Sequence, residues 1–358
     1  MKKILYIIDF FGIGGAEKLV LSVINGICDD MEQHLIILSE PATLLEQIKA
    51  PCKTTVLDFR SYRDLWKTKK IIKEYVRDND IDIIHSHLYW ANIISRMIGF
   101  KKLKIINSVQ AISSEASYKI NRTTLYLEKI TYKKRHHIIG VSAEVLKDFD
   151  KWVGLKGPSS VLYNIIDDKF FAPNPKTEFS KQGLKLVAVG NLRWQKNYPY
   201  LIEAFKNLPS SISLDIYGEG DLRNELLKEI DKHKLNIRLC GHHTSLYEIL
   251  PQYDVFVMCS LYEGFSLGLM EAMAIGLPPV LSDVPVLKEA GGDAAFYVDL
   301  NKPKDFSDKI IHLEKNKTEL AIIAKAAHAR AFQMANPKAH IEQLMKLYGV
   351  TLPELKLI

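Results

Sequence analysis

The stretch that decides the fold reads Ser260-Leu-Tyr-Glu-Gly-Phe-Ser-Leu-Gly-Leu-Met-Glu-Ala-Met-Ala-Ile-Gly-Leu-Pro278. It follows the apolar run 255–260, which has the length and composition of a buried parallel strand, and it becomes helical from about Ser266. The loop between this strand and this helix carries Glu263, Gly264 and Phe265. Ligands of open α/β sheets bind at the edge where such loops lie. The free N–H groups that begin the helix, over Gly264 to Leu267, favour a phosphate there.

Glu271 is the only charged residue in the otherwise apolar helix that follows this loop. A buried carboxylate destabilises a fold by several kcal/mol unless it is hydrogen-bonded. A vicinal diol, such as the ribose 2′,3′-diol of a nucleotide, would satisfy both of its oxygens. Two other interpretations stay open, because Glu271 could instead meet an arginine or a backbone N–H inside the core, or face solvent.

Glu263 and Glu271 are separated by seven residues in the context E-G-F-S-L-G-L-M-E-A-M-A-x-G-x-P. This pattern resembles the E-x7-E signature of retaining nucleotide-sugar glycosyltransferases of family 4, which have the GT-B architecture. The match continues to Glu289, so it is more specific than a glycine motif alone. The resemblance implies an α/β fold in which two Rossmann-like domains, each with a doubly wound parallel sheet, face each other across a cleft. It also implies that Glu263 hydrogen-bonds the hydroxyls of the donor sugar and that Glu271 binds the ribose.

The rest of the chain alternates strands and helices at the spacing of doubly wound parallel sheets. In the first half we expect strands at 3–10, 34–39, 54–58, 81–87, 104–109 and 137–141, and helices at about 64–78, 90–99, 119–135 and 143–152. The polar segment 171–183, with two prolines, is typical of a linker. In the second half, residues 303–333 read as helical and a last helix begins near Asn336. With the resemblance, this predicts an acceptor-binding domain at 1–173, joined by a C-terminal helix at 336–358, and a nucleotide-sugar-binding domain at 174–335.

A glycine-rich loop, Phe11-Gly-Ile-Gly-Gly-Ala-Glu-Lys18, precedes the first helix. Its glycines permit a close approach of the backbone to an anion or a sugar. The third glycine of the dinucleotide-binding fingerprint is missing, so a dinucleotide is disfavoured. In family 4 the similar G-G-A-E loop borders the donor phosphates and the acceptor, and this resemblance assigns that role to Gly14 and Gly15.

His85 and His87 end the predicted strand 81–87. A metal would need a third ligand, and none is in view. Family 4 has a comparable His-x-His that lines the acceptor side of the cleft, and His87 is the candidate because it lies closer to the strand's end. Gln110 stands where many members carry a histidine close to the transferred sugar. An amide cannot act as a general base, and the exchange is consistent with a different donor sugar or acceptor.

Arg193 and Lys196 lie in the loop 191–197, after a predicted strand at 186–190. Cations at this edge would hold a diphosphate and stabilise its charge as it leaves, although a solvent-facing pair is equally compatible. The loop is similar to the family pattern G-R-L-x-x-x-K-N, in which Lys196 aligns directly while Asn191 takes the place of the expected arginine. Family 4 holds the nucleobase largely through backbone groups, which correspond to Gly241 and His242. We expect Lys196→Ala to lower turnover far more than stability.

The composition, 47% hydrophobic and 25% charged, is ordinary for a soluble globular protein, and no apolar run is long enough to cross a membrane. Four cysteines without a C-x-x-C pair favour a reduced, cytoplasmic protein with no structural metal. The net charge of +6 lies in the first half, with 26 basic against 20 acidic residues at 1–173 and 22 against 22 at 174–358. The basic helices interleave with Tyr118, Tyr126 and Tyr132. They suit a phosphate-bearing acceptor or peripheral contact with the inner, anionic face of a cell membrane, or they are a solvated surface.

These observations predict a metal-independent retaining glycosyltransferase of hexosyl or N-acetylhexosaminyl units in polysaccharide or glycoconjugate biosynthesis. Its donor is a nucleoside-diphosphate sugar, expected to be a UDP-sugar and used as a co-substrate rather than a cofactor. Its acceptor is a glycan or a lipid-linked glycan, and no nucleic acid is expected as a partner. Arg193, Lys196 and the amides of Phe265, Ser266 and Leu267 replace a metal at the diphosphate. A non-catalytic nucleotide-sugar-binding protein and a nucleotide-sugar epimerase on the same fold remain alternatives, as does a glycosidase that uses Glu263 and Glu271.

Overall fold

The structure is a computed structural model that describes residues 1–27, 31–112, 122–172 and 174–350. The chain divides into two compact units. The N-terminal unit runs from Met1 to Ile165 and includes the segment that begins at Pro337, and the C-terminal unit runs from Ile166 to Asn336. Tyr118, the first residues of the helix expected at 119–135 and the last of the helix expected at 336–358 lie outside the described residues.

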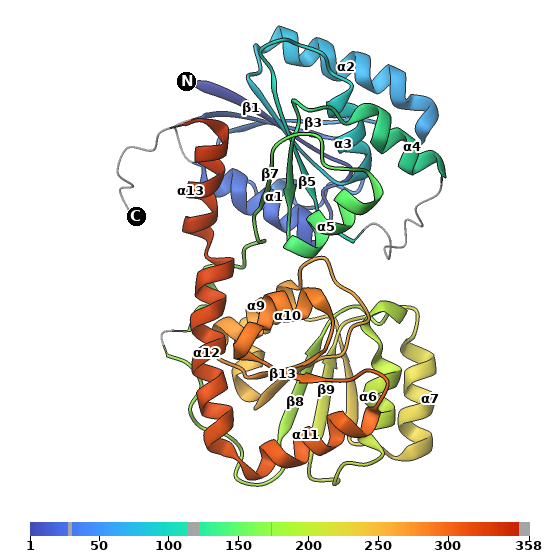
Figure 1. Cartoon of the computed structure of the whole chain (residues 1–358), viewed down its shortest axis with the longest axis vertical. Coiled ribbons are helices and arrows are strands. Elements are labelled where there is room, and N and C mark those ends of the chain that lie inside the picture. Colours follow the sequence, from blue (N-terminus) through green and yellow to red (C-terminus); the bar gives the residue numbers. More distant parts are fainter. Residues whose placement is uncertain (28–30, 113–121, 173, 351–358) are drawn as a thin grey trace. The chain divides into compact units, whose positions relative to one another are not determined.

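The N-terminal unit contains a parallel sheet of seven strands with helices on both faces (Figure 1). Its strands are β1 Lys2–Ile8, β2 Met31–Ile37, β3 Cys52–Val56, β4 Ile83–His87, β5 Lys104–Val109, β6 His137–Gly140 and β7 Ser159–Val161. Its helices are α1 Gly15–Gly26, α2 Leu65–Asp78, α3 Tyr89–Arg96, α4 Arg122–Thr131, α5 Ala143–Trp152 and α13 Pro337–Tyr348. The strands lie in the order β3-β2-β1-β4-β5-β6-β7.

The two faces of this sheet are covered by different helices because successive side chains of a strand point to opposite sides. From β1, Ile4 and Ile8 pack with residues of α1 and α13, whereas Leu5 and Ile7 pack with residues of α2 and α3. Both faces are therefore buried, and this explains why β1 reads as a continuous apolar run rather than an alternating one.

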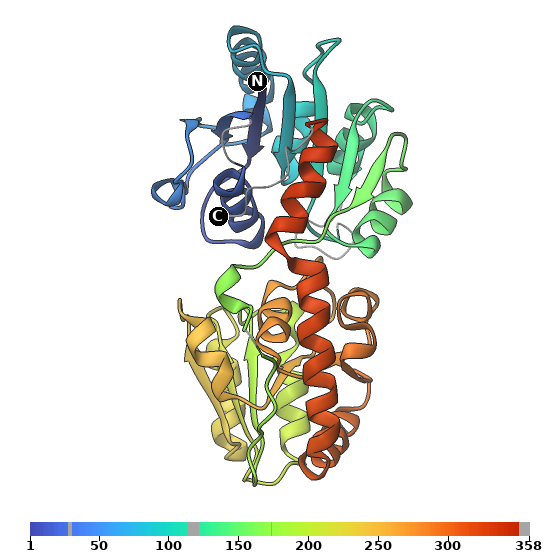
Figure 2. The same ribbon diagram turned by 90° about the vertical axis from the view of Figure 1, so that its left-hand side faces the viewer.

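The C-terminal unit contains a second parallel sheet, of six strands in the order β10-β9-β8-β11-β12-β13. Its strands are β8 Lys185–Val189, β9 Ser213–Tyr217, β10 Ile237–Gly241, β11 Val255–Met258, β12 Pro279–Ser282 and β13 Phe296–Val298. Its helices are α6 Tyr198–Phe205, α7 Arg223–His233, α8 Leu246–Ile249, α9 Leu267–Ile275, α10 Pro285–Gly291, α11 Pro303–Lys315 and α12 Lys317–Ala335. Figure 2 shows the long helix α12 along one side of this unit.

Val255 and Val257 of β11 pack in the same cluster as residues of α6, α7 and α11, and Phe256 and Met258 pack with residues of α9, α10 and α12. The prediction of two doubly wound α/β sheets is confirmed. The segment 303–333 is helical, as expected, and forms two helices, α11 and α12, with a break at Asn316.

In each sheet the strand order reverses between two neighbouring central strands, β1 and β4 in one unit and β8 and β11 in the other. The loops that leave these strands at their carboxyl ends therefore diverge, and ligands of this fold bind in the crevice that opens between them. The loop 190–197 after β8 and the loop 259–266 after β11 meet at this point in the C-terminal unit.

Candidate functional site

The reversal point of the C-terminal sheet brings together two of the residues singled out in the sequence. The Lys196 Nζ atom, in the loop after β8, lies 2.6 Å from Oε1 of Glu263, in the loop after β11. The Glu263 side chain is 7% exposed and that of Lys196 is 17% exposed, so the ion pair is largely shielded from water. An ammonium has three N–H donors, so Lys196 can hold Glu263 and still offer an N–H to a bound anion.

Local backbone features place Lys196 where it reaches Glu263. Gly190 follows β8, and a Cβ at this position would lie 2.9 Å from Cε of Lys196, so a glycine is what leaves room for the lysine stem. The carbonyl oxygen of Gly190 accepts a hydrogen bond of 2.8 Å from the Tyr198 hydroxyl. Asn197 adopts a left-handed conformation with φ 54°, which turns the chain sharply into α6.

Helix α9 begins beside this ion pair. The hydroxyl of Ser266 accepts the N–H of Leu269 at 3.3 Å, and its carbonyl accepts the N–H of Met270, so Ser266 is the N-cap of α9. A Cβ on Gly268 would lie 3.4 Å from the Val189 side chain, so the first turn packs against the end of β8. The positive end of the helix dipole is thus next to Lys196 and Glu263, and together they suit an anion.

Sequence reasoning missed two residues, Trp194 and Gln195, that link the loop after β8 to the loop after β11. Gln195 donates from Nε2 to the carbonyl oxygen of Tyr262 at 2.9 Å and lies 3.4 Å from Oε2 of Glu263. It therefore ties the two loops together. The indole of Trp194, two thirds exposed, lies 6.2 Å from the ring of Tyr262. Trp194 and Gln195 stand beside Lys196 in the sequence, but only the pairing of β8 with β11 shows what they contact.

The other predicted donor-site residues lie at the same edge of the sheet, outside the Lys196–Glu263 ion pair. Arg193 is exposed and forms no ion pair with any described residue. Glu271 is half-buried on α9. Gly241 ends β10, where its carbonyl accepts the N–H of Gly218 at 2.8 Å, and His242 is exposed next to it. Strand β9 separates Gly241 from the loop that carries Lys196.

At the reversal point of the N-terminal sheet a carboxylate occupies the start of a helix. Asp9 follows β1 and accepts the N–H groups of Trp90 at 3.1 Å and Ala91 at 2.7 Å, in the first turn of α3. Burial raises the pKa of Asp9 to about 7. Leu88, the N-cap of α3, has φ 72°, a strained conformation for a branched residue. Sequence reasoning missed Asp9, although an acid that ends a central apolar strand was a usable signal.

In the glycine-rich loop of the N-terminal unit, the carboxylate of Glu17 occupies the space next to Gly14. Gly14 is the N-cap of α1, and a Cβ there would clash with a carboxylate oxygen of Glu17. Glu17 is buried, and this burial raises its pKa. Gly15 is exposed at the first position of the helix. A ligand at this helix start would therefore meet Gly15 directly and Gly14 only beside the Glu17 carboxylate.

His87 and Gln110 are brought together at the ends of β4 and β5, where Nε2 of Gln110 lies 3.5 Å from Nδ1 of His87. His87 is buried, and its burial lowers its pKa to about 3, so the ring is neutral. The side-chain oxygen of Gln110 accepts the Asn164 amide at 3.2 Å. Since His87 is enclosed, the half-buried Gln110 is the member of this pair that a ligand can reach in this structure.

Within the described ranges, no three His, Cys, Asp or Glu side chains come together in a way that could hold a metal ion. In the same ranges, none of the helices combines the length and the apolar character that a membrane span requires.

Two family models match the chain one after the other. The model described as Glycosyltransferase Family 4 covers residues 13–170, and the model described as Glycosyl transferases group 1 covers residues 172–330.

Two relatives match most of the chain. An N-acetylgalactosamine-N,N'-diacetylbacillosaminyl-diphospho-undecaprenol 4-alpha-N-acetylgalactosaminyltransferase from Campylobacter jejuni is 28% identical, over 79% of this chain and 81% of its own. A UDP-Gal:alpha-D-GlcNAc-diphosphoundecaprenol alpha-1,3-galactosyltransferase from Escherichia coli is 27% identical, over 82% of this chain and 80% of its own. Among solved structures, Anabaena HepE in complex with UDP has a TM-score of 0.84 at 18% identity, over 98% of this chain and all of that one. The likeness to HepE shows a shared fold.

Proposed function

Because this chain belongs to the GT-B glycosyltransferases of the family 4 type, we propose that it moves a sugar from a UDP-sugar to a lipid-linked glycan, with retention of anomeric configuration and without a metal ion. The observation that carries the proposal is the Lys196–Glu263 ion pair beside the start of α9. It combines a cation for a diphosphate with a carboxylate for sugar hydroxyls at the reversal point of one sheet.

In this proposal the C-terminal unit binds the donor. The diphosphate lies over the first turn of α9, where the backbone N–H groups from Phe265 to Leu267 and the Lys196 ammonium neutralise it. Arg193, which is exposed in the same loop as Lys196, adds a second cation. Glu263 accepts hydrogen bonds from the hydroxyls of the transferred sugar, and Glu271 binds the ribose diol. Backbone groups at Gly241 and His242 hold the base.

These fixed charges are the reason that we propose a metal-independent reaction. As the bond to the sugar breaks, negative charge grows on the diphosphate oxygen. A cation and a helix start that are already in place stabilise that charge without rearrangement.

The N-terminal unit binds the acceptor through Gly15 and Gln110, and the buried His87 supports Gln110. The C. jejuni and E. coli relatives are named for diphospho-undecaprenol acceptors, and this supports a lipid-linked acceptor here.

We also propose peripheral contact between the N-terminal unit and an anionic membrane. Helix α2 exposes Trp66, which is 67% exposed, and the Lys69 Nζ lies 4.8 Å from the centre of its ring. An exposed tryptophan beside lysines is typical of a helix that lies at a membrane surface. We expect the protein to sediment with phosphatidylglycerol vesicles and not with phosphatidylcholine vesicles. Trp66→Ala should weaken binding to the phosphatidylglycerol vesicles.

The experiment that tests the enzymatic proposal combines calorimetry with a turnover assay. UDP, ADP, GDP and CMP are titrated into the protein, and UDP should bind most tightly. A panel of UDP-sugars is then incubated with glycosyl-diphosphate lipids in the presence of EDTA, and release of UDP is followed while NMR reports the anomeric configuration of the product.

Each failure of this experiment has a distinct meaning. Absence of UDP binding would refute the donor site. Binding without release of UDP from any sugar would indicate a non-catalytic binding protein, and conversion of one UDP-sugar into its epimer would indicate an epimerase. An inverted product would leave the donor site intact and refute only retention.

A further inference from the structure

A cavity of about 130 Å³ lies wholly within the N-terminal unit, at the carboxyl ends of β4 and β5. Its wall is mainly apolar, with Leu125 of α4, Phe149 of α5 and Val153 among the lining residues. Gln110, which follows β5, also lines it. The cavity is therefore next to the half-buried amide that the proposed function places at the acceptor.

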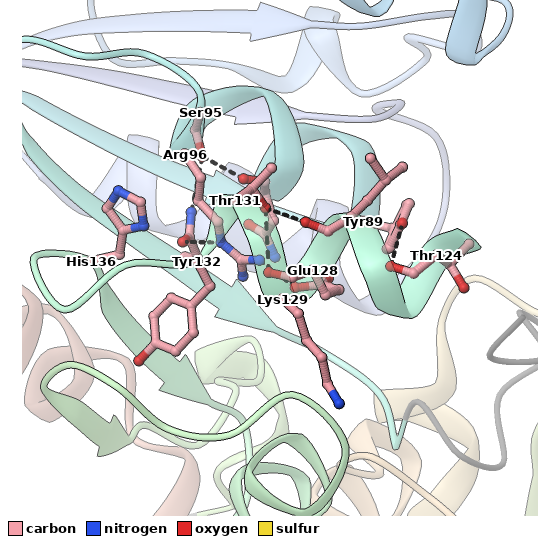
Figure 3. A network of polar contacts seen from close by, with 12 residues as sticks. Tyr89, Ser95, Arg96, Thr124, Glu128, Lys129, Thr131, Tyr132 and His136 are labelled. Carbon is pink, nitrogen blue, oxygen red and sulfur yellow. Dashed lines mark hydrogen bonds and ion pairs between the residues drawn. The ribbon is translucent and has the colours of Figure 1, made fainter. Parts of the chain in front are cut away.

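One side of the cavity carries a fixed carboxylate. Glu128, on α4, lines the cavity with its side chain 15% exposed, and its Oε2 forms an ion pair with Nη1 of Arg96 (Figure 3). Arg96 is fully buried, with its guanidinium 5.4 Å from the Tyr132 ring, and its Nε donates to Asn107 at 2.8 Å. Because Arg96 is held by several partners, Glu128 has a fixed position and presents a hydrogen-bond acceptor to the cavity.

One of the lining residues also carries a hydrogen-bond donor that lacks a partner. Trp152, on α5, lines the cavity, and its Nε1 is buried without a hydrogen bond to any described residue. A buried indole N–H normally finds an acceptor, and leaving it without one is unfavourable. The cavity thus joins one unused donor and one fixed acceptor to an apolar surface.

We propose that this cavity binds the acetamido group of an N-acetylated sugar in the acceptor. An acetamido group has a carbonyl for the Trp152 N–H, an N–H for the Glu128 carboxylate and a methyl group for the apolar wall. A cavity of about 150 Å³ is known to hold a ring of benzene size, so the volume here suits a group of this size. A hydrocarbon chain would fill the same space but leave the Trp152 N–H without a partner and the Glu128 carboxylate with Arg96 alone. The inference rests on the proposed function, because it takes the acceptor to be a glycan.

The test uses ligand pairs that differ only in this group. Glycosyl diphosphates with the same undecyl chain are prepared with a 2-acetamido or a 2-hydroxyl group, in both the gluco and the galacto configuration, and titrated into the full-length protein by calorimetry. In at least one configuration the acetamido ligand should bind about tenfold more tightly or better, which is the effect of a hydrogen bond together with a buried methyl group.

Trp152→Phe replaces the indole by a smaller apolar ring and so removes the N–H. It should reduce this ratio several-fold, whereas the control Tyr62→Phe, which also removes one hydrogen-bond donor from an aromatic side chain but at an exposed position, should leave the ratio unchanged. Equal affinities within both pairs would overturn the inference, and the wild-type protein alone suffices for that result. The titrations are repeated with the same glycosyl diphosphates on a hexyl chain. Affinity that follows the chain length and ignores the acetamido group would overturn the inference in favour of a hydrocarbon occupant.

Binding of UDP to the same samples separates this inference from the proposed function. Tight UDP binding with equal affinities in both ligand pairs refutes the acetamido site alone. An acetamido preference without UDP binding supports the cavity assignment and refutes the donor site.

Discussion

Replacing Lys196 by methionine removes a charge and keeps most of the side-chain stem. Glu263 then remains buried with Gln195 as its nearest side-chain donor, at 3.4 Å. Removing one partner of a buried ion pair destabilises proteins by about 3–5 kcal/mol. The lower end applies here, because the Lys196 side chain is 17% exposed and Gln195 remains. For a domain of this size, a loss of about 3 kcal/mol lowers the melting temperature by about 6–12 °C.

The expectation drawn from the sequence, that Lys196→Ala lowers turnover far more than stability, stays a prediction, and the ion pair with Glu263 adds an expected loss of stability to it. Thermal unfolding followed by circular dichroism measures the change. The control is the double variant Lys196→Met with Glu263→Gln, in which no charge is left unpaired, so it should recover at least half of the lost stability. Glu263→Gln alone should destabilise less than Lys196→Met, because the freed ammonium can turn towards water.

The same variants test the ligand role. Loss of a hydrogen bond from a charged donor to a phosphate weakens binding by about ten- to a hundredfold, so Lys196→Met and the double variant should both lose UDP affinity by this factor. A Lys196→Met protein with the same melting temperature as the wild type would refute the structural role of the ion pair. Unchanged UDP affinity in the stable double variant would refute the contact with the diphosphate.

Three further outcomes are expected. Glu271→Gln should weaken UDP binding in calorimetry about tenfold through the ribose and leave binding of inorganic diphosphate unchanged; equal losses for both ligands would argue against a ribose contact. Gly190→Ala should lower UDP affinity, because its Cβ would displace the Lys196 stem, and normal binding would show that this stem can shift without loss. Burial lowers the pKa of His340 to about 4 from 6.5, so the unfolded chain takes up its proton first as the pH falls. The free energy of unfolding should therefore decrease between about pH 6.5 and 4, by up to about 1.4 kcal/mol per pH unit. Urea unfolding at pH 7 and 5 should show a smaller decrease for His340→Gln than for the wild type. An equal decrease in both proteins would assign the pH dependence to other groups.

The sequence determined the fold class and the positions of the loops. Apolar runs of strand length that alternate with amphipathic segments can bury both of their faces only between layers of helices, so two parallel sheets follow from the pattern itself. The segment from Glu263 to Glu271 was informative for the same reason, since a strand, a short loop and a capped helix are all local features. The break at Asn316 between α11 and α12 was missed because both flanking segments have helical composition.

Only the tertiary structure decided which of these residues act on one another. Lys196 and Glu263 are 67 positions apart and meet because β8 and β11 are neighbours in the sheet, although β9 and β10 come between them in the sequence. The cavity lined by Glu128 and Trp152 was equally invisible, because the local sequence does not specify how separate segments pack. Local propensity sets the elements of a chain, whereas the order in which its strands pair sets the distances on which binding and catalysis depend.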